Sequence, residues 1–201
     1  MLDRDLIAYF DAEATGGHRV GHGALRHELR ARFAEELRAN DLTHLVDVGA
    51  GPGLDTEDWQ RVGFDVVGLD LAHENVRLMH QRNLRAVTGS LYTLPFHTHS
   101  FDALWTMSTF VHVPHARFDE AIAEMIRVVC PGGLLGIGTW GRQDFEGVPE
   151  FGDIRPYRFF SLASHDRWHD MLSQHATIKS FDTYAQPGAN DWHYQFALLK
   201  V

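Results

Sequence analysis

Val46-Asp47-Val48-Gly49-Ala50-Gly51-Pro52-Gly53 decides the fold, because an apolar strand here ends in an acid and runs directly into alternating glycines. Glycine is needed where a chain turns sharply and a ligand approaches the backbone, since it has no Cβ. When such a loop joins a strand to a helix, its N–H groups and the positive helix end face the ligand. Asp70 closes the next apolar strand roughly 20 residues farther on, the offset at which an acid reaches ribose hydroxyls. The two signals together predict a site for a nucleotide-type cofactor.

The spacing of the glycines indicates which cofactor the loop holds. A dinucleotide loop has glycines at its first, third and sixth positions. Here Gly49, Gly51 and Gly53 occupy the first, third and fifth, which weakens a nicotinamide or flavin interpretation. Asp-x-Gly-x-Gly-x-Gly after a strand resembles the cofactor loop of class I S-adenosylmethionine-dependent methyltransferases of the type 11-like group.

Composition and charge restrict the class of protein. The 201 residues, 44% hydrophobic and 22% charged, predict a single domain over residues 1–201 with a sizeable core. The formal charge of −9 disfavours nucleic-acid partners, because an acidic chain repels phosphate. Arginines between Arg26 and Arg38 alternate with glutamates, which indicates the solvated face of a helix. No apolar run or leader pattern predicts a membrane partner, so we expect a cytoplasmic protein of unknown oligomeric state, monomer or homodimer.

Helical and strand patterns alternate along the chain from Thr43. Apolar runs predict strands at 43–48, 65–69, 84–88, 101–105, 134–139, 177–184 and 192–201. Helical periodicity predicts helices at 25–37, 54–62, 73–82, 116–129 and 164–175. We therefore expect an α/β fold, a Rossmann-like seven-stranded, mostly parallel sheet with helices on both faces. The turn Pro187-Gly188 predicts that the last two strands form a C-terminal antiparallel hairpin. Residues 1–40 are expected to form an N-terminal helical lid or cap on a Rossmann-like core of residues 41–201.

Three further segments resemble the same methyltransferase family. They are Gly89–Phe96, which is similar to its adenine loop, Ser100–Trp105, similar to its fourth strand, and Arg127–Leu134, similar to its turn into strand five. The resemblance implies S-adenosylmethionine as cofactor and S-adenosylhomocysteine as its product. It implies that the cofactor is bound by Asp47, Gly49, Ala50, Gly51, Gly53, Asp70, Leu71, Ser90, Leu91 and Thr106. Ser90 departs from the family, which usually has an acid there to accept a hydrogen bond from the adenine amine.

Histidines after the fourth strand are the candidates for a general base. His112 and His115 follow that strand, where the family often places acceptor-side residues, and an imidazole titrates near neutral pH. A histidine between Val111 and Val113 can equally be packed, with its nitrogens bonded to the backbone. His97 and His99 have no nearby cysteine or carboxylate to complete a ligand set, so no metal is expected.

Aromatic residues mark the expected acceptor pocket and its lid. The lid and acceptor candidates are Tyr9, His18, Trp140, Tyr157 and Phe159. Aromatic walls fit a small, partly apolar acceptor. Four interleaved acids, Asp144, Glu146, Glu150 and Asp153, would favour an acceptor with an amine. Alternatively, the aromatic residues pack the C-terminal hairpin and the acids face water.

The resemblance implies a methyltransferase that acts on an O or N atom of a small-molecule acceptor, as in biosynthetic pathways. Two alternatives stay open: a methyltransferase of RNA or protein, and a non-catalytic protein that binds S-adenosylmethionine. The acidic charge argues against RNA, and Thr106-Met107-Ser108-Thr109 stands where an Asn-Pro-Pro-Tyr-like element would follow the fourth strand.

Overall fold

A computed structural model describes residues 2–17, 21, 23–150, 153–185 and 192–201. A central seven-stranded sheet has the strand order β3-β2-β1-β4-β5-β9-β8. The strands of this sheet are β1 (His44–Val48), β2 (Asp65–Asp70), β3 (Ala86–Thr88), β4 (Phe101–Met107), β5 (Val129–Gly141), β8 (Thr177–Ala185) and β9 (His193–Lys200). The pairs among β1 to β5 are parallel, whereas β9 runs antiparallel to both β5 and β8. The predicted Rossmann-like sheet with a C-terminal antiparallel hairpin is confirmed.

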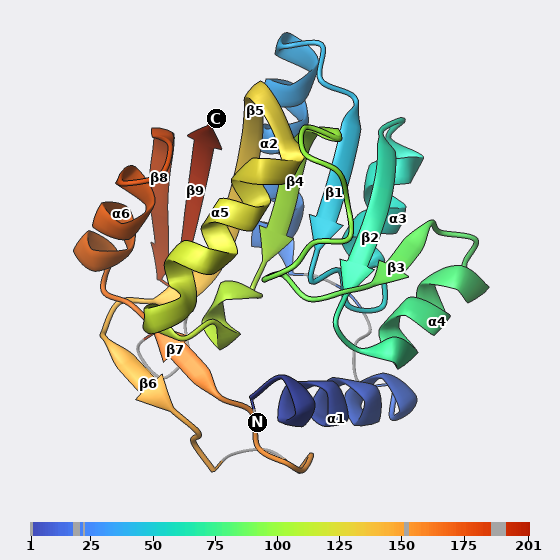
Figure 1. The fold of residues 1–201 in the computed structure, drawn as a ribbon, viewed down its shortest axis with the longest axis vertical. Helices are drawn as coiled ribbons and strands as arrows, with labels where there is room; N and C mark the ends of the chain where they lie inside the picture. Colours follow the sequence, from blue (N-terminus) through green and yellow to red (C-terminus); the bar gives the residue numbers. More distant parts are fainter. Residues whose placement is uncertain (1, 18–20, 22, 151–152, 186–191) are drawn as a thin grey trace.

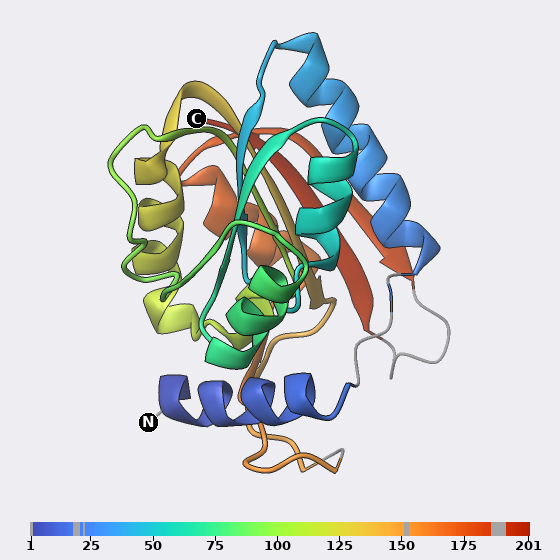
Figure 2. The same ribbon diagram turned by 90° about the vertical axis from the view of Figure 1, so that its right-hand side faces the viewer.

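Helices enclose the sheet from both sides (Figures 1 and 2). The helices are α1 (Leu2–Thr15), α2 (Ala24–Ala39), α3 (Leu54–Arg61), α4 (His73–Gln81), α5 (Phe118–Val128) and α6 (His165–Ser173), with short 3₁₀ helices η1 (Phe110–His112) and η2 (His115–Arg117). Helices α2 and α3 lie on one face and α5 and α6 on the other, while α4 packs beside β2 and β3.

Each face of the sheet has its own apolar core, because side chains alternate between the two faces along a strand. On the α2 side, Phe33 packs against Trp59 and Trp105, with ring centroids 6.0 and 5.2 Å apart. On the α5 side, Phe110, Phe118 and Trp168 form an aromatic cluster. Since α2 is built into the first core, we restrict the proposed lid to residues 1–22.

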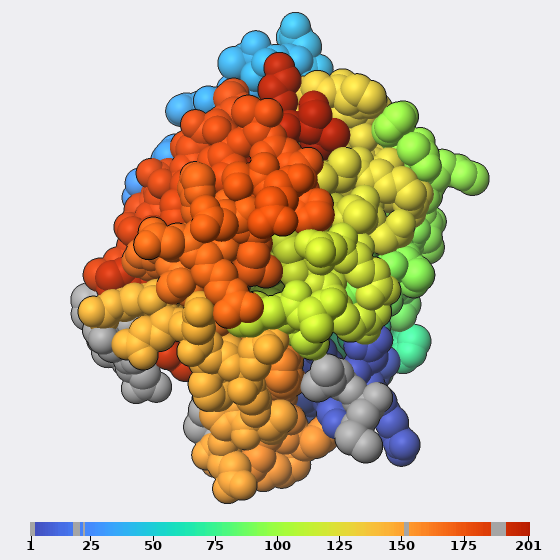
Figure 3. Space-filling model, turned by 60° about the vertical axis from the view of Figure 1, so that its left-hand side comes forward, coloured from blue at the N-terminus to red at the C-terminus, as the bar shows by residue number. Residues whose placement is uncertain are grey.

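The chain differs from the sequence-based expectation after β5. Residues 145–147 (β6, Phe145–Gly147) and 160–162 (β7, Phe160–Leu162) pair as a separate two-stranded antiparallel sheet. The sequence analysis expected no strands there, because three-residue strands show too little alternation to be recognised. Figure 3 shows this yellow-to-orange segment projecting beside α1, which is drawn in blue.

Helix α1 crosses the carboxyl ends of the parallel strands (Figures 1 and 2). It is fastened to α4, where the backbone N–H of Glu74 donates to Asp11 Oδ1 at 2.9 Å. Leu6 and Tyr9 are buried on its inner side. In open sheets of this kind, ligands bind outside the carboxyl ends of the strands, so α1 lies over the place expected for the site.

Candidate cofactor and acceptor site

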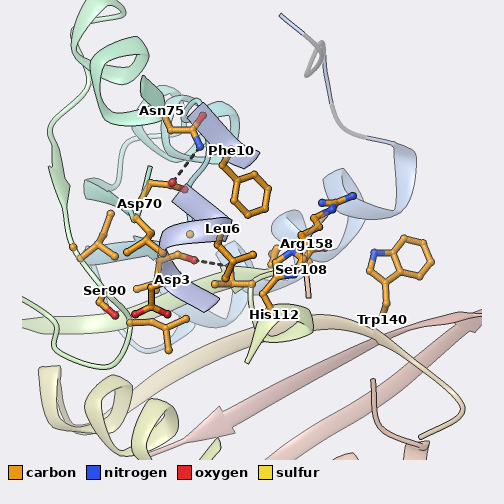
Figure 4. A pocket seen from close by; sticks show the side chains of 18 of the residues that line it. Asp3, Leu6, Phe10, Asp70, Asn75, Ser90, Ser108, His112, Trp140 and Arg158 are labelled. Carbon is orange, nitrogen blue, oxygen red and sulfur yellow. Dashed lines mark hydrogen bonds between the residues drawn. The ribbon is translucent and has the colours of Figure 1, made fainter. Parts of the chain in front are cut away.

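A pocket of about 470 Å³ lies between α1 and the carboxyl ends of β1, β2 and β4. The predicted site residues that line it are Gly49, Asp70, Leu71, Ser90, Leu91, His112 and Trp140. Its lining also includes side chains outside the predicted site, among them Asn75, Tyr92, Ser108, Thr109, Arg158 and Tyr194. Figure 4 shows Asp70, Asn75 and Ser90 at one end, the Asp70 end, and Ser108, His112, Trp140 and Arg158 at the other, the His112 end.

Glycine is obligatory at two positions of the loop after β1. Gly49 has a φ of +73°, and a Cβ there would lie 2.1 Å from Thr109 Oγ1. Gly53 has a φ of +85°, and its Cβ would lie 2.5 Å from Met79 Cγ. Both the left-handed backbone and the missing space exclude other residues. The loop therefore turns tightly from β1 into α3 and leaves the pocket open at Gly49.

Asp70 accepts three hydrogen bonds that hold the Asp70 end of the pocket together. Its Oδ2 accepts a hydrogen bond from the Gly51 N–H at 2.7 Å, and its Oδ1 accepts from the Ala72 N–H at 2.9 Å and Asn75 Nδ2 at 3.1 Å. These donors favour the ionised carboxylate. Asp70 thus joins the glycine loop to β2 and faces the pocket as a carboxylate that can accept from hydroxyl groups.

Asp47 lies below the loop and outside the pocket lining. It is buried, and Thr56 Oγ1 donates to its Oδ2 at 2.7 Å. Burial, helped by the negative charge of Asp55, raises the pKa of Asp47 to about 7. The geometry gives Asp47 a supporting contact with α3, while its assignment to the cofactor remains a proposal.

We expect Asp47→Asn to change the pH dependence of stability. The folded protein holds the Asp47 proton up to about pH 7, whereas the unfolded chain releases it near its ordinary pKa of 3.8. Between these values the folded state binds more protons, so the free energy of unfolding of the parent falls as pH rises. Asn cannot release a proton, so the variant avoids this fall in stability while its side-chain oxygen still accepts from Thr56. Above pH 7 its free energy of unfolding should exceed that of the parent by at most about 4 kcal/mol. Urea unfolding from pH 4 to 8 measures the effect, and the exposed variant Asp41→Asn is the control. If the free energy of unfolding of the parent and of Asp47→Asn changed with pH in the same way, the prediction would be contradicted.

The remaining predicted cofactor residues divide into two groups. Ser90, Leu91 and Leu71 line the Asp70 end, where Ser90 Oγ accepts from the Tyr92 N–H at 3.3 Å. Ala50, Gly51, Gly53 and Thr106 are not part of the lining. Thr106 is fully buried in β4. The structure therefore brings together the loop surface at Gly49, Asp70 and the segment around Ser90.

His112 reaches the pocket with a defined orientation. Its Nδ1 lies 2.7 Å from the carbonyl oxygen of Phe159, and because a carbonyl only accepts, Nδ1 is the atom that carries the hydrogen. In the neutral ring Nε2 is then the basic nitrogen. The ring makes edge contacts with Phe10 at 5.4 Å and Phe160 at 5.2 Å. His112 is therefore both packed and part of the pocket wall, which combines the two interpretations left open by the sequence.

His115 does not share this position. Its backbone N–H donates to Glu146 Oε1 at 2.7 Å, and its Nδ1 lies 3.6 Å from Glu146 Oε2. The side chain is absent from the lining of the pocket. Of the two candidate bases, the geometry favours His112.

The predicted lid and acceptor residues are only partly in the pocket. Trp140 lines it and packs on Tyr194 with ring centroids 5.1 Å apart. Phe159 contributes through its carbonyl to His112, and Tyr157 lies under the guanidinium of Arg155 at 3.7 Å. Tyr9 packs behind Phe10, and it is Phe10 that faces the pocket. His18 lies outside the described residues.

Arg26 and Arg30 correct the expectation of a solvated face on α2, whereas Arg38 is exposed and Arg32 partly exposed as expected. Arg30 is buried and its Nη1 donates to Asp55 Oδ1 at 2.6 Å. Arg26 lines the pocket, with its Nε 2.9 Å from Asp55 Oδ2 and its Nη1 donating to Tyr194 Oη at 3.3 Å. The local alternation of charge could not show this, because the partner Asp55 lies in α3.

Two positions were left open for the acids after β5, an amine-binding site and a solvated surface, and the structure favours the second. Asp144 accepts from the Ser164 N–H at 2.7 Å, a bond that lowers its pKa. Glu146 holds His115, and neither acid lines the pocket. Glu150 and Asp153 are exposed and also outside the lining. The acids therefore give no support to an amine acceptor.

The described part of the chain shows neither a metal-ligand cluster nor a membrane-spanning helix. Within the described ranges, no three side chains among His, Cys, Asp and Glu converge as a metal ion requires. No helix in the part of the chain that the structure describes is long and apolar enough to cross a membrane.

Comparison with known proteins gives consistent results. The family described as methyltransferase domain matches residues 46–137. Malonyl-[acyl-carrier protein] O-methyltransferase of Herminiimonas arsenicoxydans is 33% identical over 178 residues, which are 87% of this chain and 65% of the relative. Demethylmenaquinone methyltransferase of Renibacterium salmoninarum is 32% identical over 113 residues, 55% of this chain and 44% of the relative. The chain thus spans less than two thirds of the length of either relative.

A solved structure shares the fold over nearly the whole chain. It is 1,6-didemethyltoxoflavin-N1-methyltransferase of Burkholderia thailandensis with bound 1,6-didemethyltoxoflavin and S-adenosylhomocysteine. The TM-score is 0.77 at 19% identity, and the match covers 98% of this chain and 87% of the other.

Proposed function

This chain belongs to the class I S-adenosylmethionine-dependent methyltransferases, and we propose that it transfers a methyl group to an O or N atom of a small-molecule acceptor, a biosynthetic intermediate. The main observation behind the proposal is that Gly49, Asp70 and His112 line one pocket, with Asp70 at one end and His112 at the other. Relatives named for the methylation of demethylmenaquinone and of a malonyl group support a small-molecule acceptor.

The residues of the Asp70 end fit the cofactor. The pocket opens at Gly49, where a Cβ has no space, and Asp70 supplies a carboxylate suited to ribose hydroxyls. Leu71 and Leu91 offer apolar surface for a flat base, and Ser90 offers a hydroxyl in place of the usual acid. Farther along the lining, beside Tyr194, Arg26 is a fixed positive charge that suits the carboxylate of the methionine moiety. We assign these residues to cofactor binding.

S-adenosylmethionine supplies an electrophilic methyl group on a sulfonium sulfur. The protein has to hold an acceptor atom close to that methyl group and exclude water. His112 is oriented by Phe159 so that its Nε2 is the basic nitrogen, and it can take a proton from an alcohol or ammonium acceptor. For a carboxylate or phenolate no proton has to be removed, and His112 then serves as a hydrogen-bonding wall.

The remaining assignments follow from the position of α1. Residues 1–22 act as the lid, because Leu6 and Phe10 line the pocket and Asp11 fastens the helix to α4. A lid of this kind shields the reaction from water and completes the site.

Deletion of residues 1–22 is expected to lower turnover by about tenfold or more while the protein stays folded. The apolar clusters on the two faces of the sheet contain no residue of α1, so the melting temperature should change little. Phe10→Ala should reproduce part of the loss, and Arg4→Ala, an exposed position of the same helix, should not. Full activity of the truncated protein would refute the lid.

A cofactor-turnover screen tests the proposed function. Purified protein is incubated with S-adenosylmethionine and a panel of carboxylates, phenols, amines and tRNA, and S-adenosylhomocysteine is measured. Turnover with a small molecule supports the proposal, and turnover with tRNA favours the RNA alternative. Cofactor binding in calorimetry without turnover on any acceptor favours the non-catalytic alternative.

A further inference from the structure

The His112 end of the pocket has a positive character. The described carboxylates of the lining are Asp3 and Asp70, and Figure 4 shows both at the Asp70 end. Arg158 lines the opposite end, close to Ser108 and His112 in the same view. A charge is felt strongly in a partly enclosed, low-dielectric pocket, so this asymmetry selects among acceptors.

Arg158 is held by the same aromatic rings that hold His112. Its guanidinium carbon lies 4.6 Å from the ring centre of Tyr9, 5.0 Å from that of Phe160 and 5.8 Å from that of Phe10. Phe10 and Phe160 also flank the imidazole of His112. Stacking uses the face of a guanidinium, whereas its N–H groups point outward in the plane of the group. Arg158 is therefore a preoriented donor at the His112 end.

Two further arginines line the pocket. Arg26 is paired with Asp55, and Arg117 makes two hydrogen bonds of 2.8 Å to Glu120. Arg117 also stacks on Tyr92, at the Asp70 end.

The walls around Arg158 suit a flat acceptor. Phe10, Trp140 and Tyr194 line this part of the pocket, and Trp140 packs edge-on against Tyr194. Burial raises the pKa of Tyr194, so its hydroxyl stays protonated at neutral pH and can donate. Aromatic walls with a few fixed polar groups are typical of sites for planar ligands.

We propose that the methyl acceptor is a planar compound that carries a carboxylate, and that Arg158 binds this carboxylate and makes the site selective for it. A planar guanidinium matches the two oxygens of a carboxylate, which a point charge does not. The inference rests on the proposed function and names the substrate class of the same site.

The experiment measures binding of two probes of the same shape and different charge. Protein saturated with S-adenosylhomocysteine is titrated with 2-naphthoate and with its neutral isostere 2-naphthamide, followed by calorimetry or ligand-observed NMR. The parent protein should bind the naphthoate at least about tenfold more tightly. Arg158→Gln should abolish the preference, and Arg158→Lys should restore part of it.

Arg155→Gln is the matched control, since Arg155 stacks on Tyr157 outside the pocket lining, and it should keep the preference. S-adenosylhomocysteine affinity and melting temperature are measured on each variant, and Arg158→Lys carries the comparison if Arg158→Gln is unstable. Equal binding of the two probes, no binding of either, or an unchanged preference in the stable Arg158 variant overturns the proposal. If the parent protein does not bind S-adenosylhomocysteine, the proposed function is overturned instead.

Discussion

His112→Ala is expected to lower the maximal turnover rate by about 10²-fold or more when the acceptor has a proton to lose. The Phe159 carbonyl holds the hydrogen on Nδ1, so Nε2 is the basic nitrogen of a largely buried ring that lines the pocket. The variant removes that base, so the inflection of the rate near neutral pH should disappear with it. The measurement is steady-state turnover across pH 5–9 with an acceptor from the screen, together with cofactor affinity, which should stay unchanged.

The controls separate catalysis from packing. His112→Gln keeps a polar group of similar reach between Phe10 and Phe160, so it limits the cavity that Ala leaves in this aromatic contact. His115→Ala alters the neighbouring histidine, which faces Glu146, and should keep the parent rate. A folded His112→Ala variant with a near-normal rate would show that positioning alone carries the reaction. Unfolding of both His112 variants would establish that the role of the ring is packing.

Asp70→Ala is expected to weaken binding of S-adenosylmethionine and S-adenosylhomocysteine by about 1.5–3 kcal/mol, the value of hydrogen bonds to a charged group. The side chain has two tasks, because it accepts from Gly51 and Asn75 and also lines the pocket. Its loss removes the carboxylate for the ribose hydroxyls and loosens the glycine loop. Titration calorimetry on the purified variants measures the affinity.

The control for Asp70 is another acid of the same strand. Asp65→Ala lies at the opposite end of β2, where the side chain is exposed and pairs with Arg85, and it should leave the affinity unchanged. Asn75→Ala removes only one donor to Asp70 and should give a smaller loss. Equal affinity of the parent and Asp70→Ala would remove Asp70 from the cofactor site.

The patterns that gave correct predictions of the fold are local. Apolar runs and helical periodicity located six of the seven strands of the main sheet within two residues, because each pattern follows the geometry of its own element. The exception is β5, which begins at Val129, five residues before its predicted start. The glycine loop and Asp70 were predicted together for the same reason, since the turn at Gly49 depends on backbone conformation that few residues adopt. The strands β6 and β7 were missed because they pair across a long loop and are only three residues each.

The parts of the site that were missed depend on contacts between distant segments. His112 and Phe159 are 47 residues apart in the chain, and Arg30 and Asp55 are 25 apart. The sequence offered one signal for Arg158, a cation inside the aromatic run Tyr157–Phe160, but it carried no information on which rings the guanidinium would meet.

The sequence by itself determined the order of strands and helices and the glycine turn after β1, because these depend on local spacing and on motifs that the chain carries whole. Only the tertiary structure decided which charges are solvated and which are buried. Arg26 was expected in solvent, yet it reaches the pocket between Asp55 and Tyr194. The sequence left open whether the acids after β5 reach the acceptor or solvent, and the structure places them outside the pocket lining, while α1 brings Phe10 to Arg158 and His112. The physical reason is that the charge and shape of a pocket are properties of side chains that converge from separate elements, and their convergence is set by packing.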